Sequence, residues 1–135
     1  MILFSANTTG FWISFKFNEF EKNFSKRTGS KFIIGVGNGT DALYLSLRAL
    51  NIGKGDEVIT VPFTWISTAE VIMAVGAKPV FVDIEADSYN MNPELLELVI
   101  NENTKAIMPV SLFGQMPDLE RIGQIADKYE LPVIE

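Results

Sequence analysis

From residue 31 onward, short apolar runs alternate with amphipathic stretches, and turn residues stand at nearly every junction. The apolar runs predict five strands, at Phe32–Val36, Glu57–Val61, Pro79–Asp83, Ala106–Val110 and Leu131–Ile134. The amphipathic stretches predict helices near Asp41–Leu50, Ser67–Val75, Pro93–Ile100 and Leu119–Tyr129. Strands and helices in alternation predict an α/β fold with a mostly parallel sheet and helices on both faces.

The first 30 residues follow another pattern, with phenylalanines at helical spacing beside charged residues: Phe17, Phe20 and Phe24. This spacing predicts one amphipathic helix that Gly29 ends, with the rings packed against protein rather than against a ligand. We therefore divide the chain into an N-terminal helix segment at 1–30 and an α/β domain at 31–135.

Composition narrows the function classes. The chain has 135 residues, a formal net charge of −6, and neither cysteine nor histidine. It has no run of Lys and Arg, which disfavours nucleic acid and anionic membranes as partners, and the missing residue types remove thiolate chemistry and the commonest metal ligand. Met1–Ala6 is too short and uncharged for a secretory signal, and no apolar run approaches the ~20 residues that span a bilayer, so a cytoplasmic location is the default expectation.

Acidic residues do not form a convincing catalytic or metal-binding set. Asp41 is expected in the first turn of a helix, where a carboxylate is favoured electrostatically. Asp83 and Asp87 follow a predicted strand without a nearby histidine, so we interpret them as structural and expect no metal site.

A glycine-rich turn at residues 35–40 is the first candidate site, because a predicted strand leads through it directly into a helix. The first N–H groups of such a helix lack internal partners and can bind a phosphate, and Thr40 adds a hydroxyl donor. The glycine spacing does not fit the dinucleotide fingerprint, since Gly35 and Gly37 would require Gly or Ala at position 40. Such a turn, with Thr40 as a helix cap, also occurs in α/β proteins that bind nothing there.

The second candidate segment is 61–68, where a strand ends at a proline and a tryptophan precedes the next helix. Ligands of open α/β sheets bind at the carboxyl ends of strands, so Trp65 is placed to stack on a planar ring. Thr64, Ser67 or Thr68 is then expected to cap the helix. The alternative is that Trp65 fills the core.

Three motifs in this order carry a resemblance to a known family: Gly-Asn-Gly-Thr-Asp-Ala-Leu at 37–43, Gly-Asp-Glu-Val-Ile-Thr-Val-Pro at 55–62, and Val-Gly-Ala-Lys-Pro-Val-Phe-Val-Asp at 75–83. The chain resembles the DegT/DnrJ/EryC1/StrS aminotransferases from about residue 17 to residue 135. The stretches 105–110, 112–115 and 131–135 are similar to the next two strands of that family.

The resemblance implies part of the large domain of a fold-type I enzyme dependent on pyridoxal phosphate (PLP). It assigns Gly39 and Thr40 to the cofactor phosphate, Trp65 to the cofactor ring, and Ser111 and Gln115 to the substrate mouth. It further implies a homodimer that moves an amino group from an amino acid, glutamate being our expectation, to a keto group of a nucleotide-linked sugar. The resemblance also implies that this reaction serves cell-surface polysaccharide or deoxysugar synthesis.

In the family, the aspartate that pairs with the pyridine nitrogen and the Schiff-base lysine both follow the strand that resembles Leu131–Glu135. No lysine here stands in a matching context, so we expect no catalytic residue within 1–135 and no turnover by these residues alone. Two other functions stay open. One is a non-catalytic sensor or truncated interaction module of the same ancestry; the other is a dinucleotide-binding oxidoreductase domain.

Overall fold

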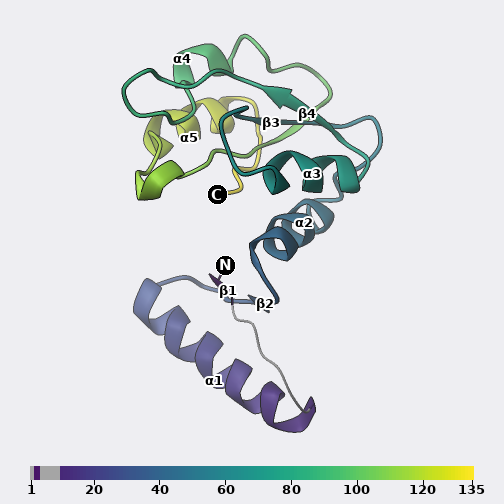
Figure 1. The fold of residues 1–135 in the computed structure, drawn as a ribbon, viewed down its shortest axis with the longest axis vertical. Coiled ribbons are helices and arrows are strands. Elements are labelled where there is room, and N and C mark those ends of the chain that lie inside the picture. Colours follow the sequence, from purple (N-terminus) through teal and green to yellow (C-terminus); the bar gives the residue numbers. More distant parts are fainter. Residues whose placement is uncertain (1, 4–9) are drawn as a thin grey trace. The chain divides into compact units, whose positions relative to one another are not determined.

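The computed structural model describes residues 2–3 and 10–135, with side chains from residue 16 onward. The chain divides into two compact units, 1–45 and 46–135 (Figure 1). The sequence-based division at residues 30 and 31 stays a prediction. The absence of a secretory signal in Met1–Ala6 concerns a segment that, apart from Ile2–Leu3, lies outside the described residues.

The first unit contains one long helix and a short parallel pair of strands. Helix α1 spans Gly10–Thr28, and Gly29 ends it with a left-handed φ of 72° while its N–H donates to Ser25 O over 2.9 Å. This confirms the predicted helix and its stop. Strand β2 (Gly35–Val36) pairs with β1 (Ile2–Leu3), so the strand predicted over Phe32–Val36 was too long.

Phe17, Phe20 and Phe24 of α1 are half-buried rather than fully covered. The rings of Phe20 and Phe24 lie 5.6 Å apart, and Phe17 packs against the backbone of Gly35. A Cβ at Gly35 would lie 2.7 Å from two Phe17 ring atoms, closer than real contacts allow. Gly35 is therefore needed for helix packing, and the expectation of protein contact for these rings is confirmed at Phe17.

The second unit is built on a three-stranded parallel sheet in the order β4-β3-β5. Its strands are β3 (Glu57–Thr60), β4 (Lys78–Phe81) and β5 (Thr104–Ile107). A parallel bridge between Ile107 and Val133 brings the last segment beside β5, so the strand predicted at Leu131–Ile134 is reduced to one bridge. The mostly parallel sheet is confirmed.

Both faces of the central strand are covered. Ile59 shares a core cluster with Leu96 of α4 (Pro93–Leu96) and Ile122 of α5 (Leu119–Lys128). The neighbouring Val58 is also fully buried but points to the opposite face, because side chains alternate along a strand. Helix α3 (Ser67–Ala74) packs on β3 and β4. The predicted α/β class with helices on both faces is confirmed.

The two ends of α4 are set by local hydrogen bonds and not by the spacing of its apolar residues. Asn92 caps α4 as expected, its side chain accepting from the Glu94 N–H over 3.0 Å. The helix ends at Leu96 rather than near Ile100, because Leu98 and Val99 donate three residues back and tighten the chain into a turn.

Candidate functional site

Helix α2 (Gly39–Ala49) opens with two N–H groups that a ligand can use. Asn38 is its cap: Asn38 Oδ1 accepts from the Asp41 N–H over 2.9 Å, and the Asn38 carbonyl accepts from the Ala42 N–H. The alternative reading of this turn, with Thr40 as the helix cap, does not hold, because Asn38 occupies that position. Gly39 and Thr40 become the first two helical residues, whose N–H groups have no partner within a helix.

The turn before α2 does not use left-handed backbone, since positive φ among the described glycines occurs elsewhere. Gly37 instead lies close to the first turn of α2. A Cβ at Gly37 would lie 2.7 Å from Asp41 Oδ2. The Asp41 carboxylate also accepts from Asn38 Nδ2 over 3.0 Å. Asp41 thus orders the turn, consistent with a structural role in the first helical turn.

Trp65 lies in the loop between β3 and α3, at the carboxyl end of the central strand. Its side chain is 77% exposed, which rules out a core-filling role. The expectation that Thr64, Ser67 or Thr68 caps α3 is wrong: Ile66 stands at the cap position without a side-chain bond. Thr64 Oγ1 and Thr68 Oγ1 lie 3.0 Å apart instead.

Ser111 and Gln115 flank the short 3-10 helix η1 (Leu112–Gly114), which follows β5. Ser111 is half-buried, and its hydroxyl donates to the Glu135 carboxylate. Gln115 is exposed and donates its N–H to Leu112 O over 3.0 Å. Because β5 is the neighbour of β3, the second unit carries Trp65, Ser111 and Gln115 at the same edge of one sheet. Gly39 and Thr40 belong to the first unit.

Sequence reasoning missed a row of aromatic rings at this carboxyl edge. The ring of Phe63 lies 5.7 Å from that of Tyr89, and Tyr89 meets Phe113 edge-on at 6.5 Å. The three rings come from the loops after β3, β4 and β5. No periodicity marks single loop residues, so only adjacency to strand ends offered a signal.

Left-handed backbone separates two kinds of position. Four described non-glycine residues have φ between 54° and 59°: Asn51, Tyr89, Phe113 and Glu130. Asn51 and Glu130 follow the last residues of α2 and α5, where such a conformation ends a helix. Tyr89 and Phe113 end no α-helix, and their rings touch. Strain of this kind clusters at ligand sites.

The opposite, amino-terminal edge of the sheet is closed by paired polar groups. Glu57 accepts from Lys78 Nζ over 2.8 Å and from Asn101 Nδ2 over 2.7 Å. The hydrogen bond from the Lys78 ammonium, helped by that from Asn101, lowers the pKa of Glu57 below 4.5. Nearby, Lys128 Nζ lies 2.7 Å from Glu97, which lowers the Glu97 pKa and raises that of Lys128.

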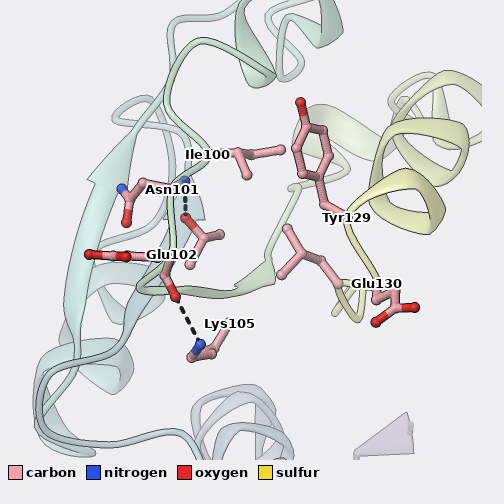
Figure 2. Close-up of a pocket in the computed structure, with 8 residues that line it drawn as sticks. Ile100, Asn101, Glu102, Lys105, Tyr129 and Glu130 are labelled. Atoms are coloured by element: carbon pink, nitrogen blue, oxygen red, sulfur yellow. Dashed lines mark hydrogen bonds between the residues drawn. The ribbon is translucent and has the colours of Figure 1, made fainter.

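A pocket of about 300 Å³ lies at this amino-terminal edge (Figure 2). Ile100 points toward the Tyr129 ring, while the Asn101 N–H donates to Thr104 Oγ1 over 3.0 Å and Lys105 Nζ to Glu102 O over 3.0 Å. These two hydrogen bonds join polar groups of the lining, and none of the predicted site residues lines the pocket. We therefore place no functional site there.

Among residues 2–3 and 10–135, no three acidic, histidine or cysteine side chains stand close enough together to hold a metal ion. Within the same residues no helix has the length and apolarity to cross a membrane.

The model of the DegT/DnrJ/EryC1/StrS aminotransferase family matches residues 5–135, further upstream than the resemblance from residue 17 suggested. The chain is 51% identical over 117 residues to a UDP-2-acetamido-2-deoxy-3-oxo-D-glucuronate aminotransferase of Pseudomonas aeruginosa, covering 87% of this chain and 33% of the relative. It is 48% identical to a dTDP-3-amino-3,6-dideoxy-alpha-D-galactopyranose transaminase of Aneurinibacillus thermoaerophilus, covering 87% and 32%. It is also 48% identical to a pleiotropic regulatory protein of Geobacillus stearothermophilus, covering 85% and 31%.

The chain also superposes on solved structures of aminotransferases. A DegT DnrJ EryC1 StrS aminotransferase of Brucella abortus superposes with a TM-score of 0.83 at 45% identity, over 87% of this chain and 34% of that one. NtdA of Bacillus subtilis, solved with bound cofactor PMP, superposes with a TM-score of 0.87 at 34% identity, over 97% and 28%. The chain spans about one third of the length of the curated relatives that it matches.

Proposed function

The chain belongs to the DegT/DnrJ/EryC1/StrS aminotransferase family, and on that premise we propose that the protein carrying it transfers an amino group to a keto group of a nucleotide-linked sugar. The match over residues 5–135 is the observation that carries the proposal. Two relatives have names that specify aminotransfer on UDP-linked and dTDP-linked sugars, which supports this substrate class. Membership of an aminotransferase family argues against the dinucleotide-dependent oxidoreductase.

The cofactor of this reaction is PLP, which serves as the electron sink that lets an amino group move between two carbon skeletons. The described residues fit it. Gly39 and Thr40 have helix-terminal N–H groups free of intrahelical bonds, as a phosphate requires, and Trp65 offers an exposed ring for stacking. We assign the phosphate to Gly39 and Thr40 and the cofactor ring to Trp65.

Ser111 and Gln115 line the substrate mouth in this proposal. The Ser111 hydroxyl donates its hydrogen to Glu135 and keeps its oxygen lone pairs to accept from a sugar hydroxyl, and the exposed Gln115 amide can donate and accept. Glutamate is the proposed amino donor. The resemblance further supports a cytoplasmic homodimer that serves cell-surface polysaccharide or deoxysugar synthesis, with the Schiff-base lysine and the pyridine-binding aspartate outside residues 1–135.

The direct test incubates the full-length protein with PLP, glutamate and UDP-linked or dTDP-linked keto sugars. We expect mass spectrometry to show an amino sugar formed in step with 2-oxoglutarate. Failure to aminate any of these keto sugars, with PLP bound, would falsify the substrate assignment. Residues 1–135 alone are expected to show no turnover and at best millimolar PLP affinity, and a single lysine adduct after borohydride reduction would contradict this.

The relative named a pleiotropic regulatory protein favours a second candidate, a non-catalytic sensor or interaction module. Its signature would be PLP or nucleotide-sugar binding without consumption of an amino donor. Measuring binding and turnover on the same preparation separates the two candidates.

A further inference from the structure

The loop after β5 is conformationally costly. Phe113 and Gly114 have consecutive left-handed φ values of 55° and 79°, and Phe113 has no glycine-like freedom to adopt one. Hydrogen bonds within the loop are short-range, such as Gly114 N–H to Ser111 O over 3.3 Å. A loop of this kind holds one shape only when surrounding structure restrains it.

Two side chains from other loops supply that restraint. At one end, the Ser111 hydroxyl donates to Glu135. At the other, Asn90 Nδ2 donates to the Met116 carbonyl over 3.1 Å, across 26 residues of sequence.

The side chain of Asn90 is buried, and its hydrogen bond to the Met116 carbonyl explains why an asparagine stands at this position. It is 2% exposed, and its Oδ1 is buried and receives no hydrogen bond within the described part of the chain. A buried amide with one unsatisfied group is costly, so the bond to Met116 is the one contact that accounts for asparagine here.

The turn that carries Asn90 is itself well fixed. The Glu85 N–H donates to Asn90 O over 2.9 Å, the Tyr89 N–H donates to Glu85 O over 3.0 Å, and the Asn90 N–H donates to Ser88 Oγ over 3.1 Å. The same turn presents the Tyr89 ring, which meets the Phe113 ring edge-on. The turn therefore touches the loop twice, once through a hydrogen bond and once through aromatic rings.

We propose that the 85–90 turn is a clamp on the Ser111–Met116 loop, with Asn90 as a positioning residue for substrate binding. The consequence for substrate rests on the proposed function, because Ser111 and Gln115 are assigned there to the nucleotide-linked sugar. Asn90 is buried and acts only through the loop. Loosening the loop costs substrate affinity and leaves the chemical step and the cofactor site unchanged.

The test compares Asn90→Ala with Asn101→Ala in the full-length, PLP-loaded protein. Asn101 is a matched control, because its amide also makes a cross-loop bond, to Glu57 at the opposite edge. In Asn90→Ala we expect amide exchange of residues 112–115 to rise about tenfold, the size of one lost buried hydrogen bond. Asn101→Ala should leave this loop unchanged.

The kinetic arm measures the KM for the nucleotide-linked keto sugar, which should rise about tenfold in Asn90→Ala with kcat within about twofold and the cofactor absorption unaltered. Phe113→Leu, at a side chain 83% exposed, removes the ring contact without threatening the fold and should raise loop exchange in the same direction. It decides the matter if Asn90→Ala does not fold.

Unchanged exchange at 112–115 in the folded variants overturns the clamp, whatever the protein does. A fall in kcat at constant KM overturns the positioning role. Raised exchange in a protein that aminates no keto sugar upholds the clamp and refutes the proposed function instead.

Discussion

The two edges of the parallel sheet differ in their side chains and in their backbone conformation. Hydrogen-bonded polar groups lie at one edge, and aromatic residues with left-handed backbone lie at the other. At the amino-terminal edge, Glu57 accepts hydrogen bonds from both Lys78 and Asn101, and the left-handed Glu130 has the ordinary task of ending a helix. At the carboxyl-terminal edge, Tyr89 and Phe113 hold strained backbone without such a task.

This difference indicates that one edge of the sheet contributes to stability and the other to ligand binding. At one edge the Glu57 carboxylate is already engaged by Lys78 and Asn101. Exposed rings, strained loops and a buried unsatisfied Asn90 oxygen lower stability at the other edge, where a parallel sheet binds its ligands. Substitutions at the amino-terminal edge should thus change stability alone, and those at the carboxyl-terminal edge should change binding.

The largest expected effect comes from the core under both edges. Ile107 is fully buried in β5 and shares a cluster with Ile59 and Ile122. Ile107→Ala removes methyl groups and leaves a cavity, so we expect a loss of about 2–5 kcal/mol of unfolding free energy. Urea denaturation checks the value, and amide exchange should rise at both edges together. Exchange that rises at one edge only would show that the edges are separate folding units.

Trp65→Ala should produce the clearest loss of binding. A stacking contact contributes about 0.5–1.5 kcal/mol beyond burial, which corresponds to a weakening of PLP affinity by about two- to tenfold. Because the side chain is 77% exposed, the melting temperature without cofactor should stay within about 1–2 °C of the parent. Fluorescence titration of the full-length protein measures the affinity. A large fall in melting temperature with unchanged affinity would reverse the interpretation.

Most of the helices and strands could be predicted from the sequence, but the ends of some of them could not. Apolar period located β3, β4 and α5 to within a few residues, because burial on the sheet dictates hydrophobic spacing. Glycine and proline correctly marked the end of α1 and the start of α4. The short β2 and α4 were overextended, because strand pairing and local three-residue hydrogen bonds set their ends.

The candidate site divided in a similar way. Trp65 could be predicted as a site residue because an aromatic residue at a strand end is a local signal, and its role stays a prediction. The clamp was not found, because Asn90 and Met116 are 26 residues apart and only the folded chain brings them together. Which residue caps α2 or α3 depends on backbone angles, and several polar side chains near each start gave the sequence no way to choose.

Glycine substitutions compare the left-handed residues of the two edges directly. Phe113→Gly and Glu130→Gly each relieve strain at a φ near 55°, so each should raise stability, by up to about 1 kcal/mol, offset in part by the greater entropy of the unfolded chain. Thermal denaturation checks the gain. Only Phe113→Gly should raise the KM for the nucleotide-linked sugar. Equal kinetic effects would remove the distinction between a helix-ending residue and a site residue.

The smallest effect concerns the ion pair that closes the amino-terminal edge. The pKa of Glu57 is lowered below 4.5 in the folded chain, mainly by the hydrogen bond from Lys78. The folded state therefore binds this proton less readily than the unfolded state does, and the pair's stabilisation is complete only above about pH 4.5. It is lost as the pH falls through the lowered pKa.

Glu57→Gln removes this titration, so the stability of the variant should fall less steeply with acid than that of the parent. Near pH 7 the two proteins should differ little in stability, because exposed ion pairs contribute little. Urea midpoints from pH 7 down to pH 3 measure the slopes. A parent and a Glu57→Gln variant that lose stability in parallel below pH 4.5 would show that the edge is held by packing and not by this ion pair. The kcat/KM at pH 7 should be unchanged in Glu57→Gln, because Glu57 does not lie at the edge that binds substrate.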